Sequence, residues 1–184
     1  MNKPLEPIAA ALLALAAVSA SADAAPAAVE PLVQPKQLIV DHSLPQATAE
    51  AMILAARRYD TFWDTGDARY ARLALAPDFI DQTLPAGRPQ GTQGPLTASA
   101  NFRQAVPDLR CEVEQMIVAG DRVSAFLHFR GHFSGRFGEH QGKGQTIDFI
   151  AMDTYRIRDG VIGEDWHLED NLTLLQQMNV VASH

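Results

Sequence analysis

Two acids and one phenol in this sequence lie within or beside apolar segments, where their chemistry could serve proton transfer. Tyr59 lies on the apolar face of a predicted helix, Asp153 lies inside a strand-like run, and Asp170 follows the last strand-like run. A carboxylate at the rim of an apolar pocket can have a raised pKa, which suits it to exchange protons near neutral pH. A phenol and a neutral carboxylic acid can both donate a hydrogen bond to a developing negative charge. These residue types therefore point to acid–base chemistry.

Each of the three residues also has an ordinary structural interpretation. Tyr59 on an apolar helix face can simply fill the core. Asp170 can cap a helix that begins just after it. Asp153 can pair with Arg156 or Arg158 at the surface. Because burying an aspartate without a partner is costly, a buried Asp153 would itself indicate a site.

The remaining reactive side chains favour structural roles. Cys111 is the only cysteine, and it lies in an apolar/polar alternation without an activating group nearby, which favours a buried thiol in a strand over a nucleophile. No cysteine/histidine spacing typical of a zinc site is present, so no metal is expected. His128, Arg130 and His132 share one face of a predicted strand, which favours an exposed or dimer-forming surface over a ligand set.

The elements that must position these side chains fall into helices followed by strands. Apolar residues at helical spacing predict a helix over residues 46–65, ended by Gly66. Asp67 is placed to cap a second helix over 68–75, which Pro77 interrupts, and a third helix is expected over 96–105. Between them a short strand over 79–83 is followed by a loop rich in proline and glycine.

The second half of the chain changes to strand-like patterning. Strands are expected over 111–119, 123–133, 145–157 and 161–168, and the turn Asp159-Gly160 is a strong hairpin signal. Helices followed by a run of antiparallel strands predict an α+β fold, with the helices packed on one face of a curved sheet. Such a sheet leaves a concave cavity, the usual setting for a small ligand.

The first 45 residues differ from the rest. Residues 1–24 combine Lys3, an apolar run and small residues at a cleavage-type spacing, which is typical of a secretory signal peptide; an uncleaved anchor is the alternative. Residues 25–45 are expected to form an Ala/Pro-rich leader before a domain over 46–184. We therefore expect a periplasmic or secreted protein. Its net charge of −7 argues against nucleic acid and anionic membranes as partners of the cleaved chain.

Several segments, taken in order, resemble the SnoaL-like polyketide cyclases. They are Arg57-Arg-Tyr-Asp-Thr-Phe-Trp-Asp-Thr-Gly-Asp67, Val106-Pro-Asp-Leu-Arg-Cys-Glu-Val113, Ala119-Gly-Asp-Arg-Val123, Arg156-Ile-Arg-Asp-Gly-Val-Ile162 and Glu164-Asp-Trp-His-Leu-Glu-Asp170. The resemblance implies the cone-shaped fold of nuclear transport factor 2, which ketosteroid isomerases share. It also implies ring closure by removal of a proton next to a carbonyl of an apolar small molecule, without metal or organic cofactor.

The resemblance also implies roles for the three residues introduced first. The family's acid–base carboxylate follows the pattern Trp-x-x-x-Asp, which here is Trp166 and Asp170. Comparison with ketosteroid isomerases assigns Tyr59 and Asp153 to hold the enolate oxygen. The general base of those isomerases falls near Thr83, which cannot serve, so Asp81 on the same strand face becomes its candidate substitute.

Six further contacts to the substrate are expected, and two of them carry a reservation. The expected substrate-binding residues are Trp63, Asp81, Phe102, Phe133, Trp166 and His167. Phe133 stands where the family often has histidine, and His167 points away from Trp166 on a regular strand. A non-catalytic periplasmic binder of an apolar small molecule is the alternative function, and a homodimer through the His128 face is a further expectation.

Overall fold

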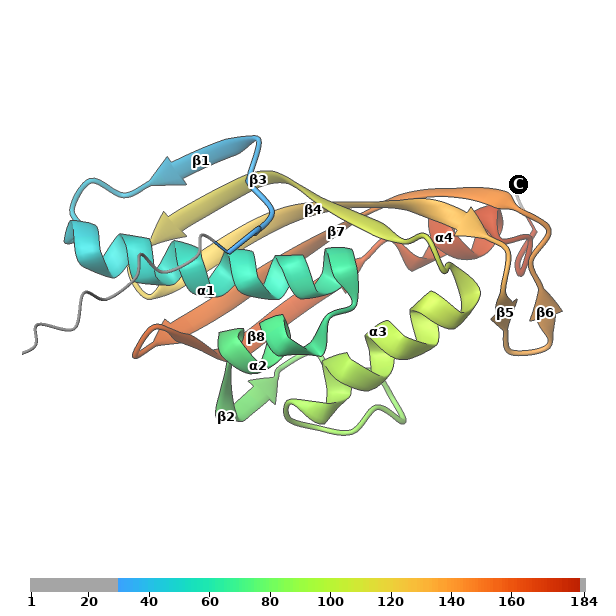
Figure 1. Ribbon diagram of the computed structural model, residues 1–184, viewed down its shortest axis with the longest axis horizontal. Coiled ribbons are helices and arrows are strands. Elements are labelled where there is room, and N and C mark those ends of the chain that lie inside the picture. The colour runs from blue at the N-terminus through green and yellow to red at the C-terminus, as the bar shows by residue number, and fades with distance from the viewer. Residues whose placement is uncertain (1–29, 183–184) are drawn as a thin grey trace, which may run out of the picture. The chain divides into compact units, whose positions relative to one another are not determined.

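The computed structural model describes residues 30–182 (Figure 1). From Pro31 onward these residues form one compact unit. The expected signal peptide over residues 1–24, and with it the cleavage site, lies outside the described residues. Within those residues, no helix is both long enough and apolar enough to cross a membrane.

Four helices and a six-stranded sheet make up the fold, which confirms the α+β class. The helices are α1 (Gln46–Thr65), α2 (Ala68–Ala74), α3 (Gln93–Ala105) and α4 (Asn171–Gln177). The strands of the sheet are β1 (Gln37–Val40), β2 (Leu75–Asp81), β3 (Arg110–Ala119), β4 (Arg122–Phe133), β7 (Gln145–Arg158) and β8 (Val161–Glu169). A small hairpin, β5 (Arg136–Phe137) and β6 (His140–Gln141), leaves the end of β4.

The sheet has the order β1-β3-β4-β7-β8-β2. Strands β3, β4, β7 and β8 form an antiparallel meander, and each outer strand joins it in parallel, β1 beside β3 and β2 beside β8. The turn from β7 to β8 is the predicted Asp159-Gly160, with both residues at positive φ (51° and 75°). This is the backbone that a tight hairpin requires, and it fixes the register between β7 and β8.

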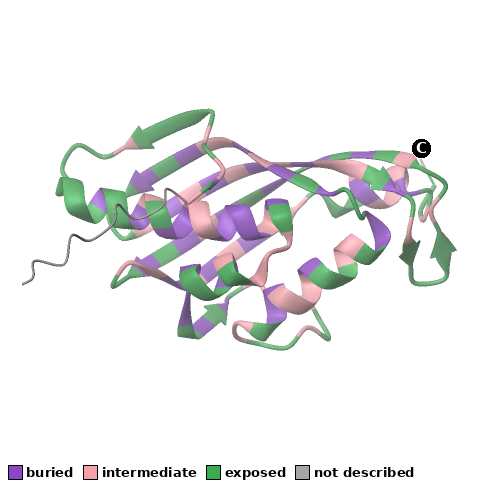
Figure 2. Ribbon diagram, viewed as in Figure 1, coloured by how far each residue is buried: buried purple, intermediate pink, exposed green. Residues whose placement is uncertain are grey.

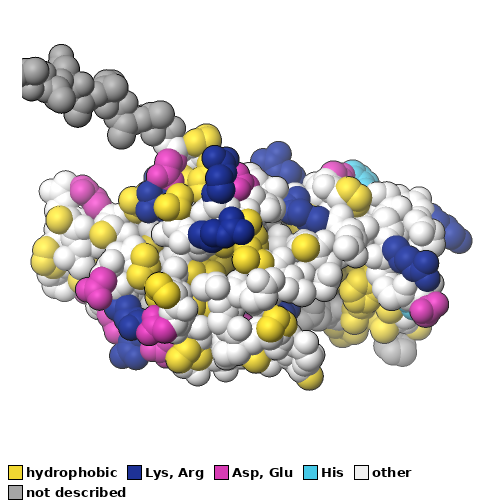
Figure 3. Space-filling view, turned by 60° about the horizontal axis from the view of Figure 1, so that its bottom comes forward, with side chains coloured by type: hydrophobic (Ala, Val, Ile, Leu, Met, Phe, Trp, Pro, Cys, Tyr) yellow, Lys and Arg dark blue, Asp and Glu magenta, His cyan; other side chains and the backbone are white. Residues whose placement is uncertain are grey.

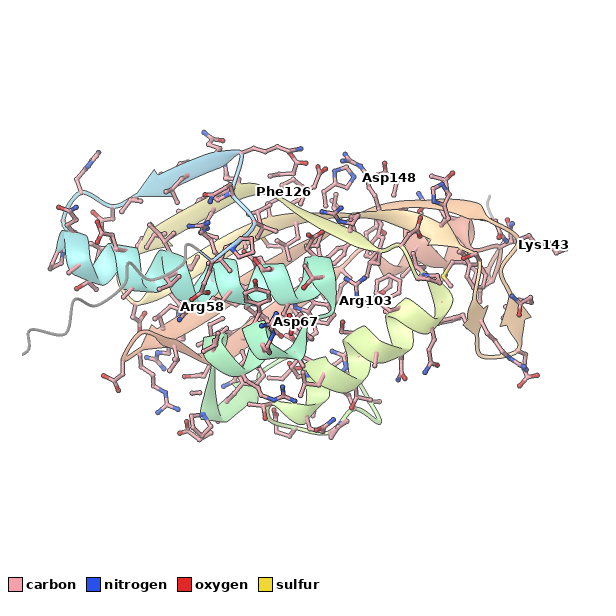
Figure 4. All side chains as sticks on the ribbon, viewed as in Figure 1. Arg58, Asp67, Arg103, Phe126, Lys143 and Asp148 are labelled. Atoms are coloured by element: carbon pink, nitrogen blue, oxygen red, sulfur yellow. The ribbon has the colours of Figure 1, made fainter. Side chains whose placement is uncertain are left out.

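Local sequence signals explain where the helices begin and end. Gly66 adopts a left-handed conformation (φ 75°) and its N–H bonds to the carbonyl of Phe62, which ends α1 as predicted. The Asp67 side chain accepts a hydrogen bond from the Arg69 N–H and caps α2. Arg103 of α3 donates to the last carbonyls of α1, those of Trp63 and Asp64, each at 2.7 Å (Figure 4). The angle between α1 and α3 is therefore held by a charged side chain.

Helices α1, α2 and α3 lie on the same side of the sheet (Figure 1). The buried residues alternate along each central strand, and the buried stripe of α1 faces them (Figure 2). Cys111 lies in β3 within this core, as expected. The concave face of the sheet is thus an interior surface that can hold a site.

The opposite face of the sheet carries polar and apolar side chains in contact with solvent. His128 and Arg130 bind the exposed Asp148, which Figure 4 labels, and His132 pairs with Asp108. His132 is exposed and the other two are half-buried, so the three residues lie on the outer face, and the dimer-forming role stays a prediction. Figure 3 shows that basic and acidic side chains also lie intermingled on the face that carries the helices.

Two elements differ from the sequence-based expectation. Strand β1 lies inside the segment expected to be a leader, and it pairs with β3 from Gln37↔Gln115 to Val40↔Val118. Strand β2 begins at Leu75, before the proline expected to interrupt the chain. Pro77 is tolerated because β2 is the last strand of the sheet, where one side of the strand needs no hydrogen-bond donor.

Candidate active site

A cavity of about 690 Å³ lies between the concave face of the sheet and the helices. One part of its wall is aromatic. Phe129 and Phe149 stack with ring centroids 5.2 Å apart, Phe102 packs against Phe149 at 5.9 Å, and Trp63 meets Phe129 edge-on at 6.4 Å. This wall offers an apolar, planar surface to a ligand.

The other part of the wall is built from acids on three adjacent strands. The register places Asp153 of β7 directly opposite His167 of β8, and Asp165 of β8 beside both Tyr155 of β7 and Asp81 of β2. All five of these side chains are buried. The pleat of the sheet turns them toward the helices, because alternate residues of a strand share a face.

His167 is held between two carboxylates. Its Nδ1 lies 2.8 Å from Oε1 of Glu169, and its Nε2 lies 3.2 and 3.1 Å from the two carboxylate oxygens of Asp81. Burial alone lowers the pKa of His167, but the hydrogen bonds and charges of Glu169 and Asp81 together outweigh burial and raise this pKa to about 9. The imidazolium therefore donates from both nitrogens at neutral pH and places one positive charge in the acid wall.

Asp81 is fixed by its own loop. Its carboxylate accepts a hydrogen bond from the Thr83 N–H at 2.9 Å, and its backbone N–H and C=O both bond to the side chain of Gln90. The Thr83 hydroxyl oxygen accepts a hydrogen bond from the backbone N–H of His167. Arg88, from the same loop, lies 4.0 Å from Asp81 and lines the cavity. The loop after β2 thus orients both members of the Asp81–His167 pair.

Two cavity carboxyls have raised pKa values. Burial raises the pKa of Asp153 to about 7, although the neighbouring His167 charge opposes the rise. Burial and the negative charge of Asp153 raise the pKa of Asp165 well above its ordinary value. Oδ1 of Asp165 is buried without a hydrogen-bond partner. Burial therefore favours the protonated form of Asp165, while Asp153 exchanges between its two states near neutral pH.

Tyr59 of α1 faces the acid wall from the helix side. It is 2 % exposed, lines the cavity, and packs edge-on against Tyr155 with ring centroids 5.5 Å apart. Burial, followed by the charges of Asp165 and Asp153, raises its pKa well above the ordinary tyrosine value. Tyr59 therefore remains a neutral phenol beside those carboxyls and can donate a hydrogen bond.

The structure brings six of the nine expected site residues together at the cavity. They are Tyr59, Trp63, Asp81, Phe102, Asp153 and His167. The surface pairing considered for Asp153 does not occur, because Asp153 is buried and bonds to Tyr155. His167 faces inward and lines the cavity, on the opposite side of β8 from Trp166, as the strand alternation predicted.

Three expected site residues lie elsewhere. Asp170 is exposed and caps α4, accepting hydrogen bonds from the N–H and hydroxyl of Thr173, which lower its pKa. Trp166 lies on the opposite sheet face from His167, with the Arg122 guanidinium 4.9 Å from its ring centre. Phe133 is fully buried in the core and does not line the cavity. The capping role weighed for Asp170 is therefore the one its contacts support, and the geometry does not join it to Tyr59 and Asp153.

Four residues of the site were not singled out from the sequence: Asp60, Tyr155, Asp165 and Glu169. A signal for two of them was present. Asp165, His167 and Glu169 alternate along β8, so they share one face, while Trp166 and Leu168 share the other. Asp60 gave no comparable signal, because a charged residue next to Tyr59 reads as the solvent side of α1.

The acid wall is the natural place to look for a cation, but its geometry does not form a metal site. Among residues 30–182, no group of three or more histidine, cysteine or carboxylate side chains is arranged to hold a metal ion. Both ring nitrogens of His167 are hydrogen-bonded to carboxylates, so neither is free to bind a metal ion.

Comparison with known proteins identifies the family. The family described as SnoaL-like polyketide cyclase matches residues 53–178. A "putative polyketide cyclase" from Bacillus cereus ATCC 10987 is 44% identical, with a TM-score of 0.77 over 84% of this chain and 97% of that one. IdmH from Streptomyces antibioticus is 26% identical, with a TM-score of 0.61 over 68% and 96% of the two chains.

More distant structures share the fold. TsrD from Streptomyces laurentii is 22% identical, with a TM-score of 0.64 over 75% of this chain and 99% of that one. No curated protein sequence matched the chain. The matched family covers most of the cavity-forming elements, from α1 through α4. This chain therefore belongs to the SnoaL-like polyketide cyclase family.

Proposed function

We propose that the protein catalyses a cofactor-independent reaction of the cyclase or isomerase type, in which a proton is removed next to a carbonyl of an apolar small molecule. The observation that carries the proposal is the pair Asp153 and Asp165 in one cavity wall, both buried, with burial raising the pKa of Asp153 to about 7 and that of Asp165 well above its ordinary value. Two carboxyl groups whose surroundings separate their pKa values are typical of an acid–base site.

Asp153 is the proposed base. A pKa of about 7 makes the carboxylate available at neutral pH and still basic enough to accept a proton from carbon. Asp81 is less suited to this role, because it shares its charge with the His167 imidazolium at 3.1 Å. Asp170, the residue assigned by resemblance, lies outside the cavity, so the role passes to a carboxyl that reaches it.

Asp165 and Tyr59 are the proposed donors to the enolate oxygen. Burial raises the pKa values of both groups and so favours their protonated forms, and both face the cavity beside Asp153. A neutral acid and a phenol, fixed in a site of low polarity, stabilise the negative charge that develops as the proton leaves carbon. The His167 cation, directly opposite Asp153 in the sheet, adds a fixed positive charge.

The cavity favours a largely apolar carbonyl compound with a planar part. The aromatic wall supplies the apolar contact surface. The lining also carries the carboxylates of Asp153, Asp81 and Glu169 and an equal number of basic side chains, those of His167, Arg88 and Arg136. Polar groups of the substrate are therefore expected at the acid wall, and its apolar part against the aromatic rings.

Hydrogen–deuterium exchange at carbon tests the proposal without knowledge of the full reaction. A panel of apolar ketones and β-keto esters is incubated with the protein in D₂O, and loss of the α-proton is followed by NMR. Wild-type protein is expected to accelerate exchange for a subset of the panel. Asp153→Asn should lower that rate by about 100-fold or more, the usual contribution of a general base.

Asp148→Asn is the matched control, because Asp148 is an exposed aspartate on the other face of the sheet. It should leave the exchange rate unchanged. Equal rates for wild type and Asp153→Asn would remove Asp153 from the mechanism. No exchange with any compound that the protein binds would count against catalysis as a whole.

A non-catalytic binder of an apolar small molecule is the second candidate function, favoured by the extent of the aromatic wall. In that case thermal-shift measurements would detect ligands from the same panel, because binding stabilises the folded state. Those ligands would show no accelerated exchange. Comparing the two assays on the same compounds separates the two functions.

We also propose that the chain is exported, on the strength of the apolar segment and small residues within its first 24 positions. Expression in a Gram-negative host, followed by fractionation and mass determination of the mature N-terminus, tests this. Release to the periplasm with cleavage after Ala22 or Ala24 is expected. Uncleaved protein in the cytoplasmic fraction would contradict export.

A further inference from the structure

Behind the cavity wall, a buried tyrosine joins two buried carboxyl groups. The Tyr155 hydroxyl lies 2.7 Å from Oδ1 of Asp60 on α1 and 3.1 Å from Oδ2 of Asp153 on β7. Asp60 and Tyr155 are 0 % exposed and Asp153 is 5 % exposed. Of the three, only Asp153 lines the cavity.

Counting protons shows that this arrangement cannot hold two carboxylates comfortably. Burial and the charges of its neighbours raise the pKa of Tyr155 well above its ordinary value, so the residue keeps its phenolic proton. A phenol has one proton and can donate one hydrogen bond. Two ionised acceptors would leave one carboxylate facing the phenol oxygen without a donor, which is costly in a buried site.

The position of the extra proton follows from the contacts of Asp60. Its second oxygen, Oδ2, is buried and has no hydrogen-bond partner. An ionised Asp60 would leave part of its negative charge unpaired there, whereas a protonated Asp60 presents only a neutral carbonyl oxygen. A protonated Asp60 can donate to the Tyr155 oxygen, and Tyr155 can then donate to Asp153. The unpaired atom thus favours the neutral state of Asp60.

We propose that Asp60, Tyr155 and Asp153 form a relay in which the two carboxyl groups share one proton, in addition to the phenolic proton of Tyr155. In its resting form the shared proton lies on the buried Asp60, and the cavity carboxyl Asp153 is ionised and ready to act as a base. When the Asp60 proton moves to Tyr155 and the Tyr155 proton moves to Asp153, Asp153 becomes the acid and Asp60 the carboxylate, with no net change in charge. Asp60 and Tyr155 act through Asp153 and are therefore positioning residues. The catalytic meaning of the relay rests on the function proposed above, but its proton count does not.

Other titratable groups face the relay and must be considered in its titration. Those nearest are Tyr59 on α1, Cys111 on β3, Asp165, His167 and Glu169 on β8, and Asp81 on β2. The pKa values of Tyr59 and Cys111 are raised above ordinary values that are already high, so these groups stay neutral from pH 5 to 8, and burial favours the protonated form of Asp165. The pKa of His167 is raised to about 9, so His167 stays charged over most of that range. The changes expected in this interval therefore come from Asp60 and Asp153.

Carboxyl titration of the ligand-free full chain tests the relay. Protein labelled with ¹³C at the aspartate side-chain carboxyl is titrated from pH 5 to 9 by NMR, using wild type, Asp60→Asn and Tyr155→Phe. Wild type should show Asp60 and Asp153 ionising far above the ordinary aspartate range in two coupled steps, with the signal of Asp165, whose pKa is also raised, assigned and followed separately. Asp60→Asn should remove one of them and leave Asp153 with a simple one-site curve.

Tyr155→Phe separates a relay from mere proximity. In the relay Tyr155 donates to the Asp153 carboxylate and lowers its pKa, so losing this hydrogen bond should raise the Asp153 midpoint, by about 1 pH unit for one hydrogen bond. Tyr70→Phe, a half-buried tyrosine on α2 away from the cavity, is the control and should change neither midpoint. Dispersed amide spectra verify folding of each variant, and Asp60→Asn, which is nearly isosteric, keeps the test decisive if Tyr155→Phe fails to fold.

Three outcomes would overturn the relay: full ionisation of both aspartates at pH 5, an unchanged Asp153 curve in Tyr155→Phe, or independent one-site titrations in wild type. None of these depends on turnover. If one of these outcomes is found while the protein still accelerates carbon-acid exchange, the relay is wrong and the proposed function stands. If the two aspartates titrate in coupled steps but no carbon-acid exchange is found, the relay stands and the proposed function is wrong.

Discussion

Replacing Asp60 by asparagine should make the protein progressively more stable than wild type as the pH rises from 5 to 7. Burial raises the pKa of Asp60 in the folded state to about 8, against an ordinary value of 3.8. Between these two values the folded protein keeps the proton and the unfolded chain releases it. The wild type therefore loses stability as the pH rises, while asparagine does not titrate.

The size of the effect follows from the number of protons involved. One proton bound only by the folded state changes the free energy of unfolding by about 1.4 kcal/mol per pH unit, or about 2.7 kcal/mol between pH 5 and pH 7. Asp153 contributes equally to wild type and variant in this range, because Asp60 is neutral in the folded state of both. The difference between the two proteins thus isolates Asp60.

Urea unfolding of both proteins at pH 5, 6 and 7 measures this difference. A constant offset is expected from the exchange of a hydroxyl for an amide, but the slope with pH does not depend on that offset. Parallel stability curves would refute the reasoning, because they would mean that Asp60 is ionised in the folded state throughout this range, as in a buried, well-paired carboxylate.

Three other substitutions probe the wall, the pocket and the cap. His167→Gln should destabilise the protein most at pH 6 and least near pH 10. The folded-state pKa of His167 is about 9, above the ordinary 6.5, so its stabilising effect is complete below pH 6.5 and is lost as the pH rises past 9. Thermal unfolding across this pH range measures the effect. Phe149→Ala should cost about 3 kcal/mol in urea unfolding and weaken binding of apolar ketones, since it removes a stacked ring from the core. Asp170→Ala should weaken α4, seen as faster amide exchange over residues 171–177, and should leave carbon-acid exchange intact. Loss of carbon-acid exchange with α4 intact would return Asp170 to the mechanism.

The fold could be predicted from the sequence because its signals are local and mutually consistent. The helix from residue 46 to 65 has a strong apolar repeat and a glycine stop, and the structure reproduces both limits. The four central strands alternate clearly and are joined by turn residues, so their bounds agree to within one residue. Strand β1 has only four residues, mostly exposed, and such a strand takes its structure from pairing with β3 rather than from its own pattern.

The site was predicted only in part, because choosing the inner face of β8 required information that the strand itself does not carry. Trp166 suggests an inward face by its size, and that choice places Asp170 inward as well. The structure turns Asp165 and His167 inward instead, where Asp81 of β2 supplies a hydrogen-bond partner for His167. Trp166 remains outside, where the Arg122 guanidinium covers its ring. Partners from distant strands decided the face, and no single-strand pattern contains them.

The pairing of β1 with β3 has a practical consequence for anyone who shortens this protein. A chain that starts at residue 46, where α1 begins, would lack β1, so the ten-residue strand β3 would become the edge of the sheet with unpaired backbone amides and carbonyls. Such borders recruit strands from other molecules and promote aggregation. Strand β1 therefore protects β3 against self-association, and recombinant versions should begin no later than Pro31.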